Sequence, residues 1–429
     1  MNSKFTLLSC ALACSCALNA ANAANTHSYF NDEFGLDLTL KNELRRADKP
    51  SAGTNHNIGA WVQGVMLKLD SGWLNDYVGM EGGYYYVAKL AAPETMHTRW
   101  YLNDSDNFGF WTGAAKFRYK DVVKLKLGRF GTDYSQGYLP YDVPLISQNS
   151  NRTLPTASQG ALLMVHPHDN VDIWAMYRNR VFTSTSALQG GFRDEGVYRA
   201  STNDYDRKNR YFAAISFYDD NNRLSLGYSY QEDVARLYQL DLNNNFKLNS
   251  DHSISTQLRY YGGQTLGEST IISEQSNRAD STNLYAFKVT WTNPYGIFNA
   301  SVGFLTDATY GQAIDSDMGF VNSLSLDRNH DAMFAFELGF AKPLGAGFTI
   351  ALAPIMTRGY EDRTHQVEVH GYSLNYGIMY KAPSGPLKDL SVNLFGDWGF
   401  EERDGSKFGD RLDYWDIKLS IQYNFDIFS

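Results

Sequence analysis

The stretch AAKFRYKDVVKLKLGRF, residues 114–130, decides the fold class, because cationic and apolar side chains alternate along it. Two short runs, 116–120 and 123–127, meet at a tight turn, Lys120-Asp121. Successive side chains of a strand point to opposite faces, so each run has one wholly cationic face and one wholly apolar face. The pattern fits a soluble sheet whose charges face water, and it also fits a membrane barrel whose charges face an aqueous lumen.

The segment that follows, Phe130 to Gln159, is long for a connection between strands and is rich in Tyr, Pro, Asn and Ser. Connections of this length are uncommon and are often functional. Its tyrosines, Tyr134, Tyr138 and Tyr141, and its prolines favour a folded loop. We interpret the whole stretch as a cationic wall followed by a constriction loop, 130–160, that folds into a pore.

The first 23 residues predict a cleaved secretory signal peptide that directs export through the Sec pathway. MNSK is a basic start, Phe5–Leu18 is an apolar run, and Ala21-Asn22-Ala23 is a small-x-small cleavage site. Residues 24–429 are then expected to form a single domain without cysteine, since all three cysteines lie in the leader. A lipoprotein signal is the alternative interpretation of Cys10, Cys14 and Cys16.

Composition narrows the class of protein further. Beyond the leader no run of 18 apolar residues could form a transmembrane helix, which leaves an exported soluble protein or an outer-membrane barrel. The net charge of -9 argues against nucleic acid as a partner. Aromatic residues make up 14% of the chain, with 29 Tyr and 8 Trp, and aromatic girdles at the two membrane interfaces would account for them.

Segments of alternating polar and apolar residues continue to the end of the chain. Short turns between these segments alternate with longer connections. We count 18 strands, give or take two, and predict an all-β fold, a transmembrane antiparallel β-barrel with an inward-folded third loop. A soluble β-sandwich is the alternative. Besides the two runs above, the predicted strands are 35–45, 57–69, 77–89, 161–165, 171–181, 210–218, 223–231, 235–248, 253–261, 282–291, 296–305, 332–341, 348–357, 366–380, 390–400 and 412–428.

Signatures of catalysis are missing. The chain contains no G-x-S-x-G, H-E-x-x-H, P-loop or C-x-x-C motif, so we predict that it is not an enzyme and needs no metal or cofactor. The pairs His166/His168 and His365/His370 lie beside turns or loops, where a solvated surface role outweighs a metal site. A hydrolase with its site at the barrel rim remains an alternative, because spacing alone does not exclude it.

The cations of the predicted lumen wall are the main indication of function. Rings of basic side chains select anions in pores, and Arg binds a carboxylate with two parallel hydrogen bonds. Salt bridges with lumen carboxylates are the competing explanation. Arg129 falls on the apolar face, and we expect it to turn into the pore beyond the strand end. Strand parity points these cations inward: Arg45, Lys116, Arg118, Lys120, Lys124, Lys126, Arg178, Arg180, Arg259, Lys288 and Lys418.

The segment LGRFGTDYSQGYLPYDVPLISQNSNRTLPTASQGA, residues 127–161, resembles the strand and inward-folded third loop of OprD-type porins. A strand-end Arg, a Leu-Pro element, an S-x-x-R-x-x-P motif and a Gly opening the next strand match the family pattern, with extra residues after Pro144. The matching positions are Arg129, Leu139-Pro140, Ser150, Arg152, Pro155 and Gly160.

Longer segments are similar to the outer-membrane glucuronide-uptake porins of enteric bacteria. They include KNELRRADKPSAG (41–53), RDEGVY (193–198) and SLSLDRN (323–329). The resemblance implies an 18-stranded barrel, a third-loop eyelet, a basic ladder that guides carboxylate-bearing solutes, and functional coupling to an inner-membrane glucuronide carrier. It also implies that Arg129 and Arg152 are the loop-base and loop-tip cations.

Together these observations predict an outer-membrane porin for passive diffusion of β-glucuronides or related anionic sugars. Tyr134, Tyr138 and Tyr141 could stack on sugar rings while Arg groups hold the acid. A chitoporin-like pore for neutral oligosaccharides is the alternative within the transport class. The expected partners are outer-membrane lipid, lipopolysaccharide and a small anionic sugar, in a homotrimer or a monomer.

Overall fold

The structure is a computed structural model. It describes residues 34–51, 54–93, 98, 102, 105–133, 139–147, 153–182, 193–194, 196–199, 204–267, 270, 279–307, 320–321, 330–406 and 409–427. The predicted signal peptide, 1–23, lies outside these residues. No helix in the described ranges is long and apolar enough to cross a membrane.

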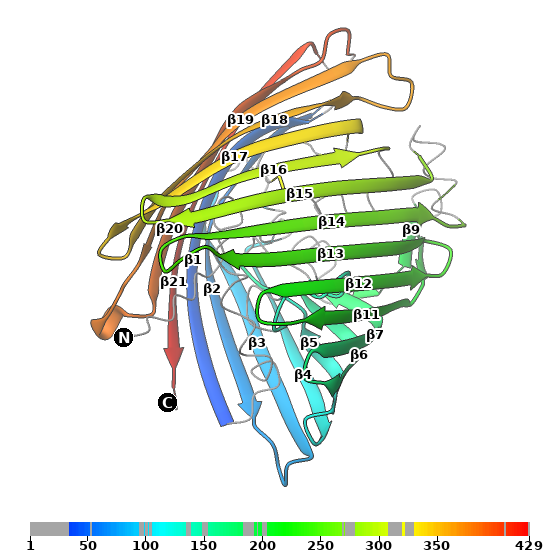
Figure 1. The fold of residues 1–429 in the computed structure, drawn as a ribbon, viewed down its shortest axis with the longest axis vertical. Helices are drawn as coiled ribbons and strands as arrows, with labels where there is room; N and C mark the ends of the chain where they lie inside the picture. The colour runs from blue at the N-terminus through cyan, green and yellow to red at the C-terminus, as the bar shows by residue number, and fades with distance from the viewer. Residues whose placement is uncertain are drawn as a thin grey trace.

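The described chain is a closed antiparallel barrel of 18 long strands (Figure 1). The first nine are β1 Phe34–Ser51, β2 Thr54–Ser71, β3 Val78–Ala91, β4 Asn107–Tyr119, β5 Val123–Gly131, β6 Ala157–His168, β7 Val171–Phe182, β11 Arg210–Tyr218 and β12 Asn222–Gln231. The other nine are β13 Ala235–Lys247, β14 Ser253–Thr265, β15 Ser281–Asn293, β16 Gly296–Leu305, β17 Asp331–Gly345, β18 Phe348–Tyr360, β19 Glu368–Lys381, β20 Leu390–Glu402 and β21 Arg411–Asp426.

Short elements lie in the connections. β8, Arg193–Asp194, extends the edge of β7, and β9, Gly196–Arg199, pairs with β10, Asp204–Arg207. A 3-10 helix, η4, spans Gly385–Leu387 between β19 and β20.

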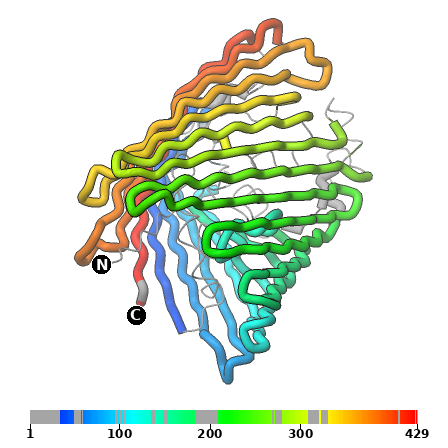
Figure 2. The backbone as a smooth tube through the Cα atoms, in the orientation of Figure 1, coloured from blue at the N-terminus to red at the C-terminus, as the bar shows by residue number. Residues whose placement is uncertain are grey.

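Pairing of the first and last strands closes the barrel. Each strand pairs with its neighbours along the chain, β7 passes directly to β11, and β1 pairs with β21 through partners such as Leu44 and Leu419. The tube in Figure 2 shows the blue and red ends of the chain side by side. A closed barrel leaves no strand edge unpaired. The predicted fold class and strand number are confirmed.

The alternation of side chains explains the strands. On β4 and β5, Lys116 and Lys126 are buried inside the barrel, whereas Phe117 and Leu127 are exposed on its outer surface. The same division holds around the ring, where Tyr, Trp, Phe and Leu make up most of the exposed large hydrophobic side chains. Lys116 and Lys126 therefore face the lumen, and the apolar face is the surface that meets lipid.

The two ends of the barrel differ. Tight turns join β4 to β5, β6 to β7, β11 to β12 and β17 to β18 (Figure 1), and the first and last described residues, Phe34 and Ile427, lie at that end. Lys120 has a positive φ of 50° in the first of these turns. The longer connections, such as those between β5 and β6 and between β7 and β11, join strand ends at the opposite end of the barrel. Outer-membrane barrels place short turns in the periplasm and long loops outside.

The largest differences between predicted and observed strand starts are at β4 and β6, which both begin early. β4 starts at Asn107, whereas the predicted run starts at 116. β6 starts at Ala157 rather than Ala161. Glycines at 109 and 160 interrupt the hydrophobic alternation there, because glycine contributes no side chain to a strand face. The first residues of β4 and β6 are strand because they pair with neighbouring strands, and the local sequence pattern does not show this pairing.

Candidate functional site

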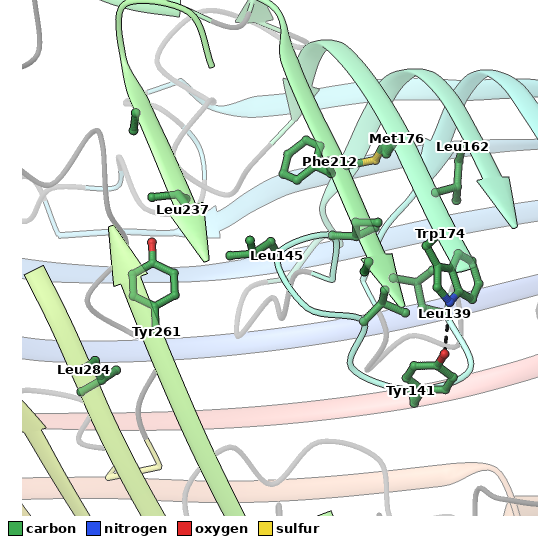
Figure 3. Packing of buried hydrophobic residues seen from close by; sticks show 14 of the residues in the cluster. Leu139, Tyr141, Leu145, Leu162, Trp174, Met176, Phe212, Leu237, Tyr261 and Leu284 are labelled. Carbon is green, nitrogen blue, oxygen red and sulfur yellow. Dashed lines mark hydrogen bonds between the residues drawn. The ribbon is translucent and has the colours of Figure 1, made fainter. Parts of the chain in front are cut away.

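A part of the third loop, residues 139–147, packs against the inner wall of the barrel (Figure 3). Leu139, Tyr141 and Leu145 of this segment join one buried cluster with Trp174 and Phe212 of the wall. Residues 139–147 therefore lie among side chains of the lumen face, as an inward-folded third loop requires. We call these nine residues the inner segment.

Asp172 at the start of β7 holds the inner segment. Tyr141 donates its phenol O–H to Asp172 Oδ2 at 2.9 Å, and Trp174 Nε1 donates to the Tyr141 oxygen at 3.1 Å. His166 Nδ1 lies 2.7 Å from Asp172 Oδ1. Burial and the Asp172 carboxylate raise the pKa of Tyr141 above its ordinary value, so the phenol stays protonated and keeps donating.

Further along, the inner segment is fixed to strands β13 and β14, three and four strands away from β7 around the wall. Asp142 accepts from Arg259 Nη2 at 2.8 Å, and Arg259 also binds Asp241, with Nε 2.6 Å from Oδ1. The backbone N–H of Leu145 donates to Gln239 Oε1 at 3.2 Å. These partners lie on β13 and β14, whereas Asp172 lies on β7, so the inner segment reaches across several strands of the lumen.

Glycine at position 227 makes room for the inner segment. A Cβ at Gly227 of β12 would lie 2.6 Å from Pro144 Cβ and 3.1 Å from the Pro144 carbonyl oxygen. Neither distance is compatible with an ordinary van der Waals contact. The backbone of β12 and the inner segment thus touch directly, and sequence reasoning did not single out this glycine.

Several of the predicted lumen cations are held by carboxylates of neighbouring strands. Lys116 pairs with Asp70, and Lys126 Nζ lies 2.6 Å from Glu81. These are the salt bridges that the competing explanation anticipated.

The same holds across the strands that close the barrel. Arg45 of β1 pairs with Asp416 of β21, and Lys418 Nζ lies 3.1 Å from Glu43. Such cations close the barrel by cross-strand pairing and contribute less to a field in the lumen than their number suggests.

The other predicted lumen cations lie at different heights along the barrel. Lys124 and Lys288 are buried on the inner face. Arg118 lies beside the short turn between β2 and β3, where its Nη2 is 2.7 Å from Asp76. Lys120 is exposed in the turn before β5, 5.6 Å from the Tyr119 ring, and so does not face the lumen.

A pair of arginines with like charge lies on the inner wall near its long-loop end. Arg178 of β7 and Arg210 of β11 are directly opposite each other in register. Their guanidinium carbons lie 4.9 and 5.1 Å from the centroid of the Phe212 ring, and Arg210 Nε donates to Ser229 Oγ at 2.9 Å. Arg210 was not among the predicted residues, although its parity with Phe212 would have placed it inward.

Arg129 is on the outer face, which corrects the expectation that it turns into the pore. Its guanidinium stacks on the exposed Trp111 ring, 4.4 Å from the centroid, and its Nε donates to Gln159 Oε1 at 2.8 Å. β5 pairs with β6 through Gly131 without a break. Because the strand continues past Arg129, the alternation of faces holds there.

Arg180 also departs from its predicted position. A bulge between the pairs Gly160–Arg178 and Gln159–Arg180 adds one residue, Asn179, to β7. The extra residue reverses the parity of the strand, so Arg180 joins Gln159 on the outer face while Arg178 remains inside.

The remaining predicted residues are not all described. Arg152, Tyr134 and Tyr138 lie outside the described residues. Within the described ranges, His365 Nε2 lies 2.7 Å from Asp331 Oδ2, and His166 is held by Asp172. No group of three or more potential metal ligands occurs in this part of the chain.

Comparison with known proteins gives the family. The family model described as outer membrane porin, OprD family, matches residues 28–427 of this chain. The chain belongs to this family. Over 420 residues it is 44% identical to the membrane-associated protein UidC of Escherichia coli K12, covering 98% of this chain and 99% of that protein. OprD-family barrels are channels of the Gram-negative outer membrane, not enzymes, and the same location and class apply here.

Solved structures agree in fold. The crystal structure of Acinetobacter baumannii OccAB4 matches with a TM-score of 0.74 at 13% identity, covering 93% of this chain and all of that one. A BenF-like porin from Pseudomonas fluorescens matches with a TM-score of 0.74 at 16% identity and the same coverage. Likeness at this level of identity describes the barrel alone.

Proposed function

We propose that this OprD-family porin allows passive, selective diffusion of β-glucuronides or related anionic sugars. The observation that carries the proposal is the pair Arg178 and Arg210 around the Phe212 ring. Two guanidinium groups at one place on the lumen wall attract an anion through their combined positive charge. A carboxylate can accept two parallel hydrogen bonds from one guanidinium.

The level of this pair in the barrel suits an approaching solute. Arg178 and Arg210 lie toward the long-loop ends of β7 and β11, whereas Asp172, which binds the inner segment, lies at the short-turn end of β7. A solute from outside would pass the level of the arginine pair before that of Asp172. In this proposal the pair collects the anion, and the loop 130–160 narrows the path behind it.

Aromatic groups complete the proposed site. A glucuronide has one carboxylate on a sugar ring, and aromatic side chains stack on such rings. Phe212 itself is buried against the two cations, so Tyr134 and Tyr138 of the loop 130–160 remain the proposed contacts of the sugar ring. Arg152 remains the proposed cation of the loop tip. Tyr141 is engaged with Asp172 and Trp174, so we assign it to holding the inner segment.

A second function is favoured by the salt bridges of the wall. Lys116, Lys126 and Arg45 each have a carboxylate partner, which weakens the cationic field along much of the lumen. A pore for neutral oligosaccharides would need no net field. The two proposals differ in whether the substrate carboxylate contributes to binding.

The test is single-channel current across a planar bilayer, with methyl β-glucuronide added and then methyl β-glucoside. Block by the glucuronide alone is expected, with its dissociation constant raised about tenfold by R210Q, or about 1.4 kcal/mol. R236Q, which changes an outward-facing arginine, is the matched control. The glucuronide should block its current as it blocks the current of the unmodified porin.

Two outcomes contradict the proposal. Equal block by both sugars would favour the neutral-oligosaccharide pore. Absence of any conductance would remove diffusion through the barrel as the function.

A further inference from the structure

Two carboxamide side chains face outward near the middle of the first two strands. Asn42 of β1 and Gln63 of β2 are direct partners in the strand register. Their neighbours in sequence, Glu43 and Val62, are fully buried on the inner face. Because successive side chains of a strand alternate, Asn42 and Gln63 point to the outer surface. We call these two residues the amide pair.

The amide pair lies between the two ends of the membrane-facing surface. The register row that contains it runs from Ile421 of β21 to Asn107 of β4. At the first end, Ile421 is one outward position from Tyr423, whose phenol donates to the Pro386 carbonyl oxygen in a short turn. At the other end, Asn107 is the first residue of β4, beside a long connection. The row therefore climbs along the tilted strands from one end of the barrel to the other, and the amide pair lies partway up.

The outward side chains around the amide pair are apolar or aromatic. Hydrocarbon tails provide no hydrogen-bond acceptor, so a polar group at this level is costly when its donors are unused. Carboxamides at such positions hold membrane segments together by hydrogen bonds across the contact. The surrounding residues are Leu40 and Leu44 of β1, Trp61 and Val65 of β2, Ala88 of β3 and Ile421 of β21.

One chain of hydrogen bonds uses half of the N–H groups of the amide pair. Trp61 Nε1 donates to Asn42 Oδ1 at 2.8 Å, and Asn42 Nδ2 donates to Gln63 Oε1 at 3.0 Å. Gln63 Nε2 donates to the Gly64 carbonyl oxygen at 2.9 Å. A carboxamide has two N–H donors, and its oxygen has two lone pairs. Within the part of the chain that the structure describes, each of the two carboxamides keeps one unused N–H and one unused lone pair.

From this arrangement we propose that the amide pair is the centre of a homodimer contact, with the outer faces of β1 and β2 of two barrels against each other. The unused donors and acceptors are equal in number, so the surface is complementary to a copy of itself. A two-fold axis along the membrane normal brings identical surfaces together and gives both barrels the same orientation in the membrane. Each amide pair then donates its unused N–H groups to the carboxamide oxygens of the other.

This complementarity favours two copies over three. In a closed trimer one face of each copy meets a different face of the next copy, whereas a two-fold contact joins identical faces. The sequence left a homotrimer and a monomer open, and a dimer differs from both. The contact is on the outside of the barrel, so it does not depend on which solute the lumen carries.

Disulfide formation between single introduced cysteines measures the contact. Residues 24–429 contain no cysteine, so each exported variant has one thiol. L44C places it beside the amide pair, and L226C places it on the distant strand β12. The two leucines are equally exposed, at 41%. In lipid vesicles, with copper phenanthroline as oxidant, L44C is expected to form covalent dimers at least tenfold faster than L226C.

The variant N42L/Q63L, in the L44C background, tests the carboxamides themselves. Leucine matches the surrounding lipid-facing surface, so the variant is expected to fold and its rate of dimer formation to fall to that of L226C. N244L is the matched control, because it removes an outward carboxamide of β13 that bonds Thr256. In the L44C background it should keep the fast rate. If N42L/Q63L does not fold, N42L and Q63L decide separately, each with an expected several-fold loss.

Native mass spectrometry of the unmodified porin in neutral detergent should give the mass of two chains. A mass of one chain or of three would overturn the proposal. Equal rates for L44C and L226C, or an unchanged rate in N42L/Q63L, would overturn it as well. Block of the current by the glucuronide should be the same in N42L/Q63L as in the unmodified porin, which separates this contact from the proposed function.

Discussion

Tyr141 and Asp172 join the third loop to the barrel wall through a hydrogen bond of 2.9 Å between the phenol oxygen and Oδ2. Tyr218 Oη donates to the other oxygen of Asp172 at 3.3 Å, and His166 approaches the same atom. One buried carboxylate therefore connects the loop to three places on the wall. The position of the inner segment depends on this centre.

Tyr141→Phe should loosen the inner segment without changing lumen charge. The variant removes one donor to a buried carboxylate, at a cost of about 1 kcal/mol, which raises the population of a detached segment about fivefold. Single-channel recordings should show more frequent current fluctuations. Tyr211→Phe changes an exposed tyrosine on the outer surface and should leave the current trace unaltered. Equal noise in both variants would contradict the anchoring role.

Gly227→Ala tests the contact between β12 and the inner segment by size alone. Its methyl group would meet Pro144 Cβ at 2.6 Å, so the segment or the strand must move. We expect a changed unitary conductance with similar ion selectivity. Gly303→Ala is the matched control, since nothing lies within 4 Å of a Cβ there. A conductance that is unchanged by Gly227→Ala would show that the segment does not limit the current.

Local alternation was enough to predict the barrel. The runs 116–120 and 123–127 repeat a two-residue period that only a strand satisfies, and Lys116 and Lys126 are inside as that period requires. The number of strands followed from the same signal repeated along the chain. Aromatic content indicated the outer surface, and Phe117 and Tyr119 are indeed exposed there.

Individual site residues were harder to predict, because they depend on partners that are distant in sequence. Parity placed Arg180 in the lumen, but the bulge at Asn179 reverses it, and a one-residue insertion has no clear local signature. The partner of Lys116 is 46 residues away. The contact of Asp172 with Tyr141 depends on how the loop folds, which the local pattern does not show.

Lys116→Met should destabilise the barrel more than the loss of one charge implies. Asp70 would keep a charge in a largely buried site, where removal of one partner costs about 3–5 kcal/mol. Adding Asp70→Asn removes that charge, so K116M/D70N should recover much of the loss. Urea unfolding in lipid vesicles, followed by Trp fluorescence, measures the difference. Simple additivity of the two single variants would argue against coupling between these residues.

The carboxyl group of Asp219, in the turn between β11 and β12, should titrate at unusually low pH. Asn222 donates from its side chain to Asp219, and the backbone N–H groups of Asn221 and Asn222 donate to Asp219 Oδ1 at 2.7 and 2.8 Å. These hydrogen bonds favour the ionised form and hold the pKa of Asp219 below its ordinary value of 3.8.

The sign of the pH effect follows from that lowered pKa. A carboxyl that is more acidic in the folded state contributes stability at pH above 3.8, and the contribution is lost as pH falls through the lower, folded value. Carbon-13 NMR of the Asp219 carboxyl in micelles should show a midpoint below 3.8. Asn222→Ala removes the side-chain donor and should move the midpoint upward. A midpoint of the unmodified turn at or above the ordinary value would mean that these hydrogen bonds do not persist in solution.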